Sequence, residues 1–248
     1  MEDISKEAIM AYIISGFLFG LLIPYIARRI GKQIPAPMGL IWLKIFMPTH
    51  YMPWTKLKTN EAYMELFKRY VMRSIGWGIF CAAATFLFAL NFDAVFTWWY
   101  IVFLWILLLL VEVDKRFMLL PDVLTLPLLI LGFLYAAQNG FWLLIPEPNF
   151  VPAPINSALG ACAGLLMPLI ASLFVVWKHP EAFGDGDIKL LAAIGAWIGF
   201  AGVPLVLLGA CAFFGAGWLI NRRRTGPFGP AIVYATLIYV VFEFAVLK

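Results

Sequence analysis

The chain has 248 residues, of which 63% are apolar and only 13% are charged, and its mean hydropathy is +0.91. Soluble domains carry roughly 25% charged residues, so this composition excludes an ordinary soluble protein. The net charge of +4 does not indicate nucleic-acid binding, because basic loops are expected on the cytoplasmic face of a membrane protein, beside anionic lipid headgroups. We therefore expect membrane lipid, and no nucleic acid, as a partner.

Repeated apolar runs predict transmembrane helices, each of which needs about 20 apolar residues to cross the bilayer. We expect an all-α, polytopic membrane protein with about eight transmembrane helices. In chain order the spans cover residues 9–27, 71–90, 95–111, 123–137, 155–177, 188–200, 203–220 and 230–247. The sixth run is short, so its boundary with the seventh, near residues 199–204, is soft.

The whole of residues 1–248 is expected to form a single integral membrane domain, with a cytoplasmic loop at 28–70 inserted between the first and second helices. Within that loop, residues 59–70 predict a short helix that enters the second span, with Asn60 as its N-cap.

Lys and Arg residues are unevenly distributed about these spans. If the spans alternate in direction, sixteen of these residues fall on one side of the membrane, and only Lys6 and Lys248 fall on the other. Basic loops mark the cytoplasmic side. We therefore expect both chain termini outside the cytoplasm.

The three cysteines and two histidines do not indicate a disulfide or a metal site. Cys81, Cys162 and Cys211 lie inside apolar runs without CxxC spacing, so we expect them to be small core residues. His50 and His179 are single histidines in loops, with no second ligand at metal spacing. No bound metal is expected.

Two acidic motifs stand at the edges of apolar runs: VDKRFMLLPD at residues 113–122 and GDGD at residues 184–187. A carboxylate at the edge of a bilayer is costly unless it is paired, hydrated or used, so it is a candidate functional residue. Each acid also has a purely structural interpretation. Asp114 fits a membrane-edge charge cluster balanced by the cations that follow it, while Asp122 and Asp185 fit helix caps.

Asp114 and Asp187 together fit an aspartyl protease dyad. In such a pair one ionised carboxylate activates water and one protonated carboxyl donates to the scissile carbonyl, because two close carboxylates do not ionise together. Gly184 and Gly186 would leave the way open for an extended substrate. The charge distribution places both acids at the cytoplasmic face, at the end of the third span and the start of the sixth.

Two segments resemble the two signature blocks of the bacterial type IV prepilin peptidases, which are membrane aspartyl proteases of the GxGD type. The segments are DKRFMLLPDVLTLPL at residues 114–128 and FGDGDIKLLAAIGAWIG at residues 183–199. A third match is the Pro-Phe-Gly-Pro run at residues 227–230. The resemblance extends from about residue 111 to the C-terminus, and eight spans are also the layout of that family. The second block is too long for a chance match.

The resemblance implies that Asp114 and Asp187 are the catalytic pair of an endopeptidase of the bacterial inner membrane. Its substrates would be type IV prepilins or type II secretion pseudopilins, cut at the end of a short basic leader. It implies no cofactor for proteolysis, and S-adenosylmethionine as methyl donor if the new N-terminus is also methylated. Lys189 is expected either to hold the pair partly ionised or to be an ordinary cytoplasmic-side lysine. Glu112, Asp122 and Asp185 are acids expected to attract the basic leader.

The chain departs from the family pattern before residue 111. Many family members carry two CxxC pairs in the first cytoplasmic loop, whereas residues 28–69 contain no cysteine, which excludes a tetra-Cys zinc site. The usual first-helix block is only faintly echoed, by GFLFG at residues 16–20 and YIARR at residues 25–29. Because that block and loop are the parts most linked to methyl transfer, the resemblance implies methylation less strongly than proteolysis.

Three alternatives remain open. A transporter or channel would use the same acids as a proton or cation relay, but this leaves the two long blocks unexplained and no interrupted spans recur in corresponding halves. Another GxGD protease, cutting signal peptides, would typically carry Tyr-Asp as its first acid, whereas Val113 precedes Asp114 here. An inactive docking scaffold is disfavoured by the presence of both acids.

Overall fold

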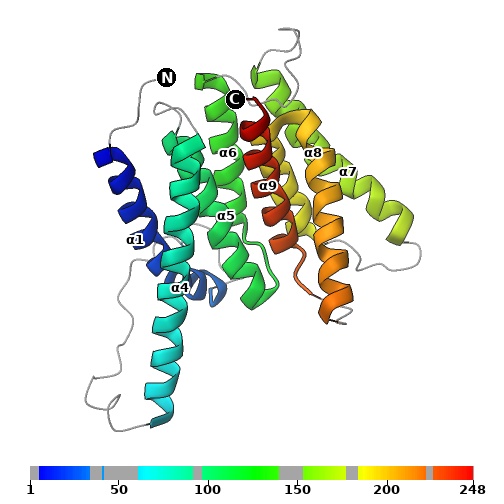
Figure 1. Ribbon diagram of the computed structural model, residues 1–248. Helices are drawn as coiled ribbons and strands as arrows, with labels where there is room; N and C mark the ends of the chain where they lie inside the picture. The colour runs from blue at the N-terminus through cyan, green and yellow to red at the C-terminus, as the bar shows by residue number, and fades with distance from the viewer. Residues whose placement is uncertain are drawn as a thin grey trace. The chain divides into compact units, whose positions relative to one another are not determined.

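The structure is a computed structural model of residues 1–248, and it describes residues 6–33, 41, 61–91, 97–139, 153–176, 184–221 and 226–247. The regular elements among these residues are all α-helices, which confirms the predicted all-α class. In chain order they are α1 (Lys6–Gly31), α4 (Glu61–Asn91), α5 (Thr97–Phe117), α6 (Asp122–Asn139), α7 (Ala153–Val176), α8 (Asp185–Asn221) and α9 (Gly229–Leu247) (Figure 1).

The chain forms two compact units, residues 1–97 and 98–248. In the first unit α1 packs against α4 through small residues. A Cβ on Gly20 would lie 2.5 Å from the carbonyl oxygen of Trp77, and one on Gly16 would lie 2.6 Å from Oγ1 of Thr85. Glycines four residues apart let two helix backbones approach closely. The GFLFG run therefore serves, in the described part of this unit, as a helix–helix contact.

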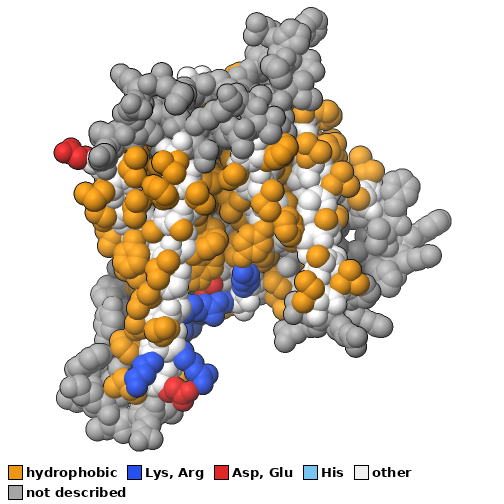
Figure 2. Space-filling view, in the orientation of Figure 1, with side chains coloured by type: hydrophobic (Ala, Val, Ile, Leu, Met, Phe, Trp, Pro, Cys, Tyr) orange, Lys and Arg blue, Asp and Glu red, His pale blue; other side chains and the backbone are white. Residues whose placement is uncertain are grey.

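The predicted short helix at residues 59–70 is part of α4. This helix begins at Glu61, directly after the predicted N-cap Asn60, and continues without a break through the predicted second span. Its charged side chains gather near its N-terminal end, in the lower part of Figure 2.

The second unit consists of α5 to α9. The C-terminal end of α5 and the N-terminal ends of α6, α8 and α9 lie at the same end of this unit (Figure 1). Both acidic motifs are located there, since one spans the connection from α5 to α6 and the other begins α8.

Helix α8 combines the predicted sixth and seventh spans. A straight helix of its 37 residues would be about 55 Å long, against a hydrocarbon thickness of about 30 Å. Instead α8 turns back at Gly199 (Figure 1), which has φ 73° and ψ −175°. That backbone conformation is essentially restricted to glycine. The soft boundary expected near residues 199–204 is this turn.

Helices α7 and α8 are in backbone contact. A Cβ on Gly160 would lie 2.1 Å from the carbonyl oxygen of Gly195, and one on Gly164 would lie 2.3 Å from that of Leu191. No side chain, not even a methyl group, fits at such distances. This contact holds the first limb of α8, the limb that begins with the GDGD motif.

Trp197 lies at the centre of the core of the second unit. Its side chain is fully buried, and its Nε1 donates a 2.8 Å hydrogen bond to the carbonyl oxygen of Leu128. The indole is stacked on Tyr135, with ring centroids 5.5 Å apart, and its centroid lies 4.6 Å from that of Phe103. Because these partners come from α5 and α6, Trp197 joins the three helices that carry the acidic motifs.

Four described helical segments are long and apolar enough to cross a membrane by length and composition: Glu7–Gly31, Met64–Leu90, Pro154–Ser172 and Asp185–Gly217. Large apolar side chains are exposed along the helices and cover most of the described surface in view (Figure 2), as lipid contact requires. Eight separate spans are not confirmed. Two predicted spans form one bent helix, α8, and α5, α6 and α9 are not among the helices that are long and apolar enough to cross a membrane.

Some predictions concern residues outside those described. They include most of the loop at 34–60, both histidines and many of the basic residues that orient the spans. The predicted orientation therefore stays a prediction.

Candidate active site

Asp114 lies near the end of α5, beyond the apolar run, where the N-terminus of α9 approaches it. The side chain is buried, at 4% exposure. A Cβ on Gly229, the first residue of α9, would lie 2.6 Å from Oδ2 of Asp114 and 3.2 Å from its Cγ. The absence of a side chain at Gly229 thus lets α9 approach the carboxylate with its N-terminus, the helix end that favours negative charge.

Asp187 lies in the first turn of α8 and is partly buried. The carbonyl oxygen of Gly184 accepts hydrogen bonds from the backbone N–H groups of Asp187 at 3.0 Å and of Ile188 at 3.4 Å. The backbone N–H of Gly184 also interacts with the Asp187 carboxylate. The GDGD motif therefore starts a helix, and the same local structure holds the carboxylate in place.

The two carboxylates, 73 residues apart in the sequence, line one cavity of about 460 Å³. This size falls within the range of about 300–1,000 Å³ that is usual for ligand pockets. The remaining lining comes from the turn after α5, the second limb of α8 and the segment before α9: Met118, Gly184, Cys211, Phe214, Gly215, Gly226, Pro227 and Phe228.

Burial raises the pKa of the Asp114 carboxyl from its ordinary value of 3.8 to about 6, while the backbone N–H of Gly229 acts in the opposite direction. Oδ2 of Asp114 nevertheless has no well-aligned hydrogen-bond partner among the described residues. The Asp187 carboxylate is close enough to interact electrostatically with it. Two such carboxyls share protons, so the pair, and not either acid alone, determines when each proton is lost.

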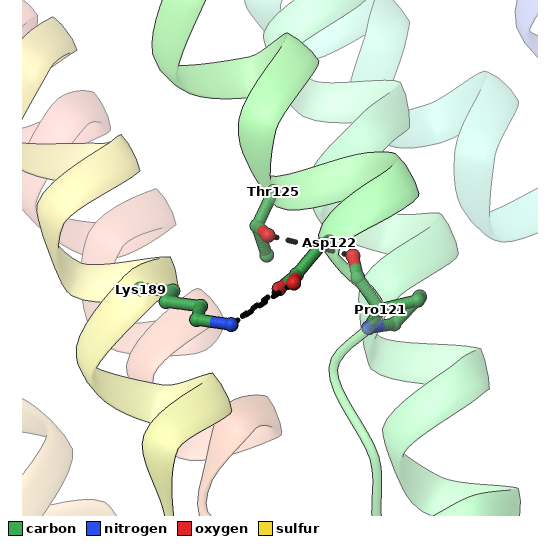
Figure 3. A network of polar contacts seen from close by, with 4 residues as sticks. All are labelled: Pro121, Asp122, Thr125 and Lys189. Atoms are coloured by element: carbon green, nitrogen blue, oxygen red, sulfur yellow. Dashed lines mark hydrogen bonds and ion pairs between the residues drawn. The ribbon is translucent and has the colours of Figure 1, made fainter. Parts of the chain in front are cut away.

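Lys189 does not pair with Asp187 in this structure. Its Nζ contacts both carboxylate oxygens of Asp122, at 2.8 and 3.0 Å, and links the start of α8 to the start of α6 (Figure 3). Of the two roles expected for Lys189, the one that requires contact with the dyad has no such contact in this structure. Lys189 instead links α8 to α6. The Asp122 carboxylate binds this cation, while Leu124 and Thr125 donate their backbone N–H groups to the carbonyl oxygen of Pro121.

The other acids near the site differ in their surroundings. Glu112 is fully buried and accepts a 2.5 Å hydrogen bond from Nε of Arg116. Lys115 donates to the hydroxyl of Tyr234 at 2.8 Å. The charge cluster expected after the third span is thus present, with Glu112 as the acid that balances Arg116. Asp185 is exposed at the first position of α8.

The two glycines of the GDGD motif have different environments. Gly184 lines the cavity, as the sequence interpretation requires. A Cβ on Gly186 would instead lie 2.9 Å from Cβ of Leu120. Gly186 therefore makes room for the connection between α5 and α6.

Residues of the cavity wall outside the signature blocks were not identified from the sequence. The prediction that all three cysteines are core residues is correct for Cys81, which is buried, and wrong for Cys162 and Cys211, which are exposed. Lipid is as apolar as a protein core, so an apolar run does not reveal which face of a helix points inward. Cys211, moreover, lines the cavity. The only available signals for the wall were the helical spacing of Cys211 and Phe214 and the Pro-Phe-Gly-Pro run.

Within the part of the chain that the structure describes, no group of three or more His, Cys, Asp or Glu side chains is placed to hold a metal ion. The chemically distinctive groups of the cavity are therefore its two carboxylates.

Residues 101–220 match the type IV leader peptidase family. This range contains both carboxylates of the cavity and the second limb of α8. No solved structure matches the chain significantly.

The chain is also similar to curated proteins called prepilin leader peptidase/N-methyltransferase. It is 34% identical to the protein of Escherichia coli (strain K12) over 195 residues, which cover 73% of this chain and 82% of that protein. It is 38% identical to the protein of Aeromonas salmonicida (strain A449) over 149 residues, covering 56% of this chain and 47% of the relative. It is 37% identical to the protein of Legionella pneumophila over 144 residues, which cover 54% of this chain and 46% of that protein. The chain thus spans about half the length of several relatives that it matches.

Proposed function

Because this chain belongs to the type IV leader peptidase family, we propose that it is a membrane aspartyl endopeptidase that cleaves the basic leader from type IV prepilins or pseudopilins. The observation that carries the proposal is the cavity lined by two carboxylates, which come from the end of α5 and the start of α8 at one end of the second unit. Asp114 is buried and Asp187 is partly buried. We propose Asp114 and Asp187 as the catalytic residues.

The chemistry follows from one shared proton. The ionised carboxylate takes a proton from a water molecule, whose oxygen attacks the carbonyl carbon of the scissile peptide bond. The protonated carboxyl donates its proton to the carbonyl oxygen, which gives a neutral tetrahedral intermediate. When this intermediate collapses, the C–N bond breaks and the leaving nitrogen receives the proton of the protonated carboxyl. The ionised carboxylate takes a proton from one hydroxyl of the intermediate, which becomes the carbonyl of the product acid, so the pair again holds one proton. No metal or cofactor is needed for this sequence of steps.

The surroundings of the two acids suit a pair in which one carboxyl is ionised and the other is protonated. Asp114 is deeply buried beside the N-terminus of α9, and Asp187 is held at the start of α8. Asp122 and Lys189 are proposed to position helices α6 and α8, and thus the first limb of α8, rather than to touch substrate. Asp185 is exposed, so it remains available to a cationic leader.

We also propose that the cavity faces the cytoplasm of a bacterial inner membrane. The excess of Lys and Arg on one side of the predicted spans supports this orientation. A prepilin would then present its basic leader on the side where the dyad lies, with its apolar segment in the bilayer.

The names of the relatives include N-methyltransferase, and the resemblance described above implies methylation of the new N-terminus. Its donor, S-adenosylmethionine, carries a sulfonium cation that two carboxylates would suit, but also a carboxylate of its own. No basic side chain is among the described residues that line the cavity. The cavity therefore does not fit the donor, and no methyl-transfer step is assigned to it. Mass spectrometry of the cleaved product, with and without the donor, tests this directly.

The proposed function is tested with detergent-solubilised protein and a type IV prepilin. Asp114→Asn and Asp187→Asn should each lower the cleavage rate by at least about 10²–10⁴-fold, the usual contribution of general acid–base catalysis. Asp185→Asn is the matched control, because it removes a neighbouring exposed carboxylate, and it should retain measurable cleavage. Wild-type cleavage by either dyad variant would refute the proposal.

The transporter alternative has no support from the family or the relatives that the chain matches. A proton-flux assay in liposomes should accordingly give no flux above that of empty vesicles.

A further inference from the structure

Glu243 is an acid that the proposed catalytic steps do not use. It lies near the C-terminal end of α9, at the end of the second unit opposite the acidic motifs (Figure 1). Its side chain is only 1% exposed, and neither of its carboxyl oxygens has a well-aligned hydrogen-bond partner among the described residues. An acid buried at membrane depth is costly, which makes Glu243 a candidate functional residue.

Three tyrosine side chains from three helices accompany this carboxyl. Tyr239, one turn earlier on α9, interacts with Glu243 through its hydroxyl. Tyr135 of α6 interacts electrostatically with Glu243, and its hydroxyl shares a 2.8 Å hydrogen bond with that of Tyr100 of α5. All four side chains are buried. Helix α8 covers the cluster from another side, because a Cβ on Gly202 would lie 3.0 Å from Cζ of Tyr239.

The cluster occupies one level of the second unit. Tyr100 lies 14 residues before Asp114 on α5, and Glu243 lies 14 residues after Gly229 on α9. At about 1.5 Å per residue, each is about 21 Å along its helix from the dyad end. With the dyad at one membrane face, as proposed above, this level lies within a hydrocarbon region of about 30 Å. Water is not available there to solvate a charge.

No cation among the described residues of this unit is placed to balance a charge on Glu243. Those residues include three cations, Lys115, Arg116 and Lys189, and each lies within two residues of a dyad acid. Helix α8, which packs against α9, has no titratable side chain between Lys189 and Cys211. Glu243 is also four residues from the end of α9, where the helix dipole disfavours a negative charge.

We propose that Glu243 is a proton-binding site inside the second unit, and that its neutral carboxyl joins α9 to α5 and α6 through the tyrosine hydroxyls. A protonated carboxyl has an O–H donor as well as acceptor capacity, so it can hydrogen-bond to these hydroxyls without the cost of a buried charge. The opposite arrangement is an ionised carboxylate that only accepts hydrogen bonds from the phenols. This site goes beyond the proposed peptidase function and does not depend on it.

Glu243→Gln distinguishes the two arrangements, because glutamine is neutral at every pH and has nearly the shape of a protonated glutamate. In the unfolded chain a glutamate loses its proton near about pH 4.3. A wild type that keeps this proton when folded therefore loses stability relative to the variant as the pH rises. In detergent, the Tm of the variant minus that of the wild type should widen between about pH 5 and about pH 7, by about 3–5 °C per pH unit. The dyad carboxyls and the three phenols are present in both proteins, so their titration cancels in this difference.

Infrared spectroscopy supplies a readout that does not depend on stability. A protonated carboxyl has a carbonyl band that an ionised carboxylate lacks. The difference spectrum between the wild type and Glu243→Gln at about pH 6 should therefore show the loss of such a band. Glu112→Gln is the matched control, because Glu112 is also fully buried but is paired with Arg116, and its difference spectrum should show the loss of ionised carboxylate bands instead.

Each other outcome refutes the proposal. A difference in Tm that stays constant or narrows as the pH rises would mean that folding does not retain the proton. Loss of ionised carboxylate bands on replacing Glu243 would mean that the carboxylate is held as an anion by the phenols. A Glu243→Gln variant that fails to fold leads to the same conclusion, since a site for a neutral carboxyl must tolerate a neutral side chain of the same shape.

Discussion

Replacing Gly229 with alanine should displace the Asp114 carboxylate while leaving both acids in the chain. The new Cβ would lie 2.6 Å from Oδ2, whereas ordinary contacts of a Cβ begin at 3.4 Å, so the atoms must separate by a further 0.8 Å. A misplacement of about 1 Å can cost about 10²-fold in rate. We therefore expect kcat to fall by about two orders of magnitude.

The measurement is the steady-state cleavage of a prepilin by the purified variant, together with its thermal unfolding. Alanine is a better helix former than glycine, so a fall in kcat with little change in Tm is the expected pattern. Gly217→Ala is the control, since its Cβ meets nothing within 4 Å. If Gly229→Ala cleaves as fast as the wild type, the close approach of α9 does not position the catalytic carboxylate.

Three further predictions concern stability. Asp114→Asn should abolish cleavage yet stabilise the protein above about pH 6. Burial raises the pKa of the Asp114 carboxyl from 3.8 to about 6. At 1.36 kcal/mol per pH unit, ionising this carboxyl in the folded protein therefore costs roughly 3 kcal/mol. The protonated carboxyl has no such cost, so the wild type loses stability as the pH rises from about 3.8 to about 6. The difference in Tm between Asp114→Asn and the wild type should therefore widen from pH 4 to pH 7, and a constant difference would contradict this. Gly160→Ala should destabilise the contact of α7 with α8, where its Cβ would lie 2.1 Å from a carbonyl oxygen, by about 1–3 kcal/mol; Gly76→Ala, in open space, should not lower Tm. Lys189→Met should cost about 1 kcal/mol or less, because both side chains of its ion pair are 47% exposed, and should retain cleavage; complete loss of cleavage would mean that Lys189 acts on the dyad.

The positions of the two acids at the ends of helices were predictable, because a carboxylate at the edge of an apolar run has few stable locations. Hydropathy located most helix ends to within about four residues. The exceptions are α5, which ends at Phe117 rather than at residue 111, α4, which includes the short helix predicted separately at residues 59–70, and the predicted break between residues 200 and 203, which lies inside α8. That break was soft in the sequence because it consists of a single backbone conformation at Gly199, which leaves the apolar run almost uninterrupted.

The partners of the charged side chains were less predictable. Lys189 lies two residues after Asp187 in the sequence, yet it contacts Asp122, 67 residues away. In a helix, side chains two residues apart point to different faces, so proximity in sequence is not sufficient to identify the partner of Lys189. Contacts of this kind depend on how helices are packed, which a single sequence does not specify.

The turn at Gly199 connects the fold to the site. Asp187 and Cys211 each lie twelve residues from Gly199, so each stands about 18 Å along its limb from the turn. A helix that turns back there brings the start of its first limb level with residues 211–215 of its second limb. Cys211, Phe214 and Gly215 of that stretch line the cavity, and Asp187 contributes one of its two carboxylates. A side chain at position 199 would strain the backbone conformation of the turn. The expected consequence is separation of Cys211, Phe214 and Gly215 from the Asp187 carboxylate, even though residue 199 does not line the cavity.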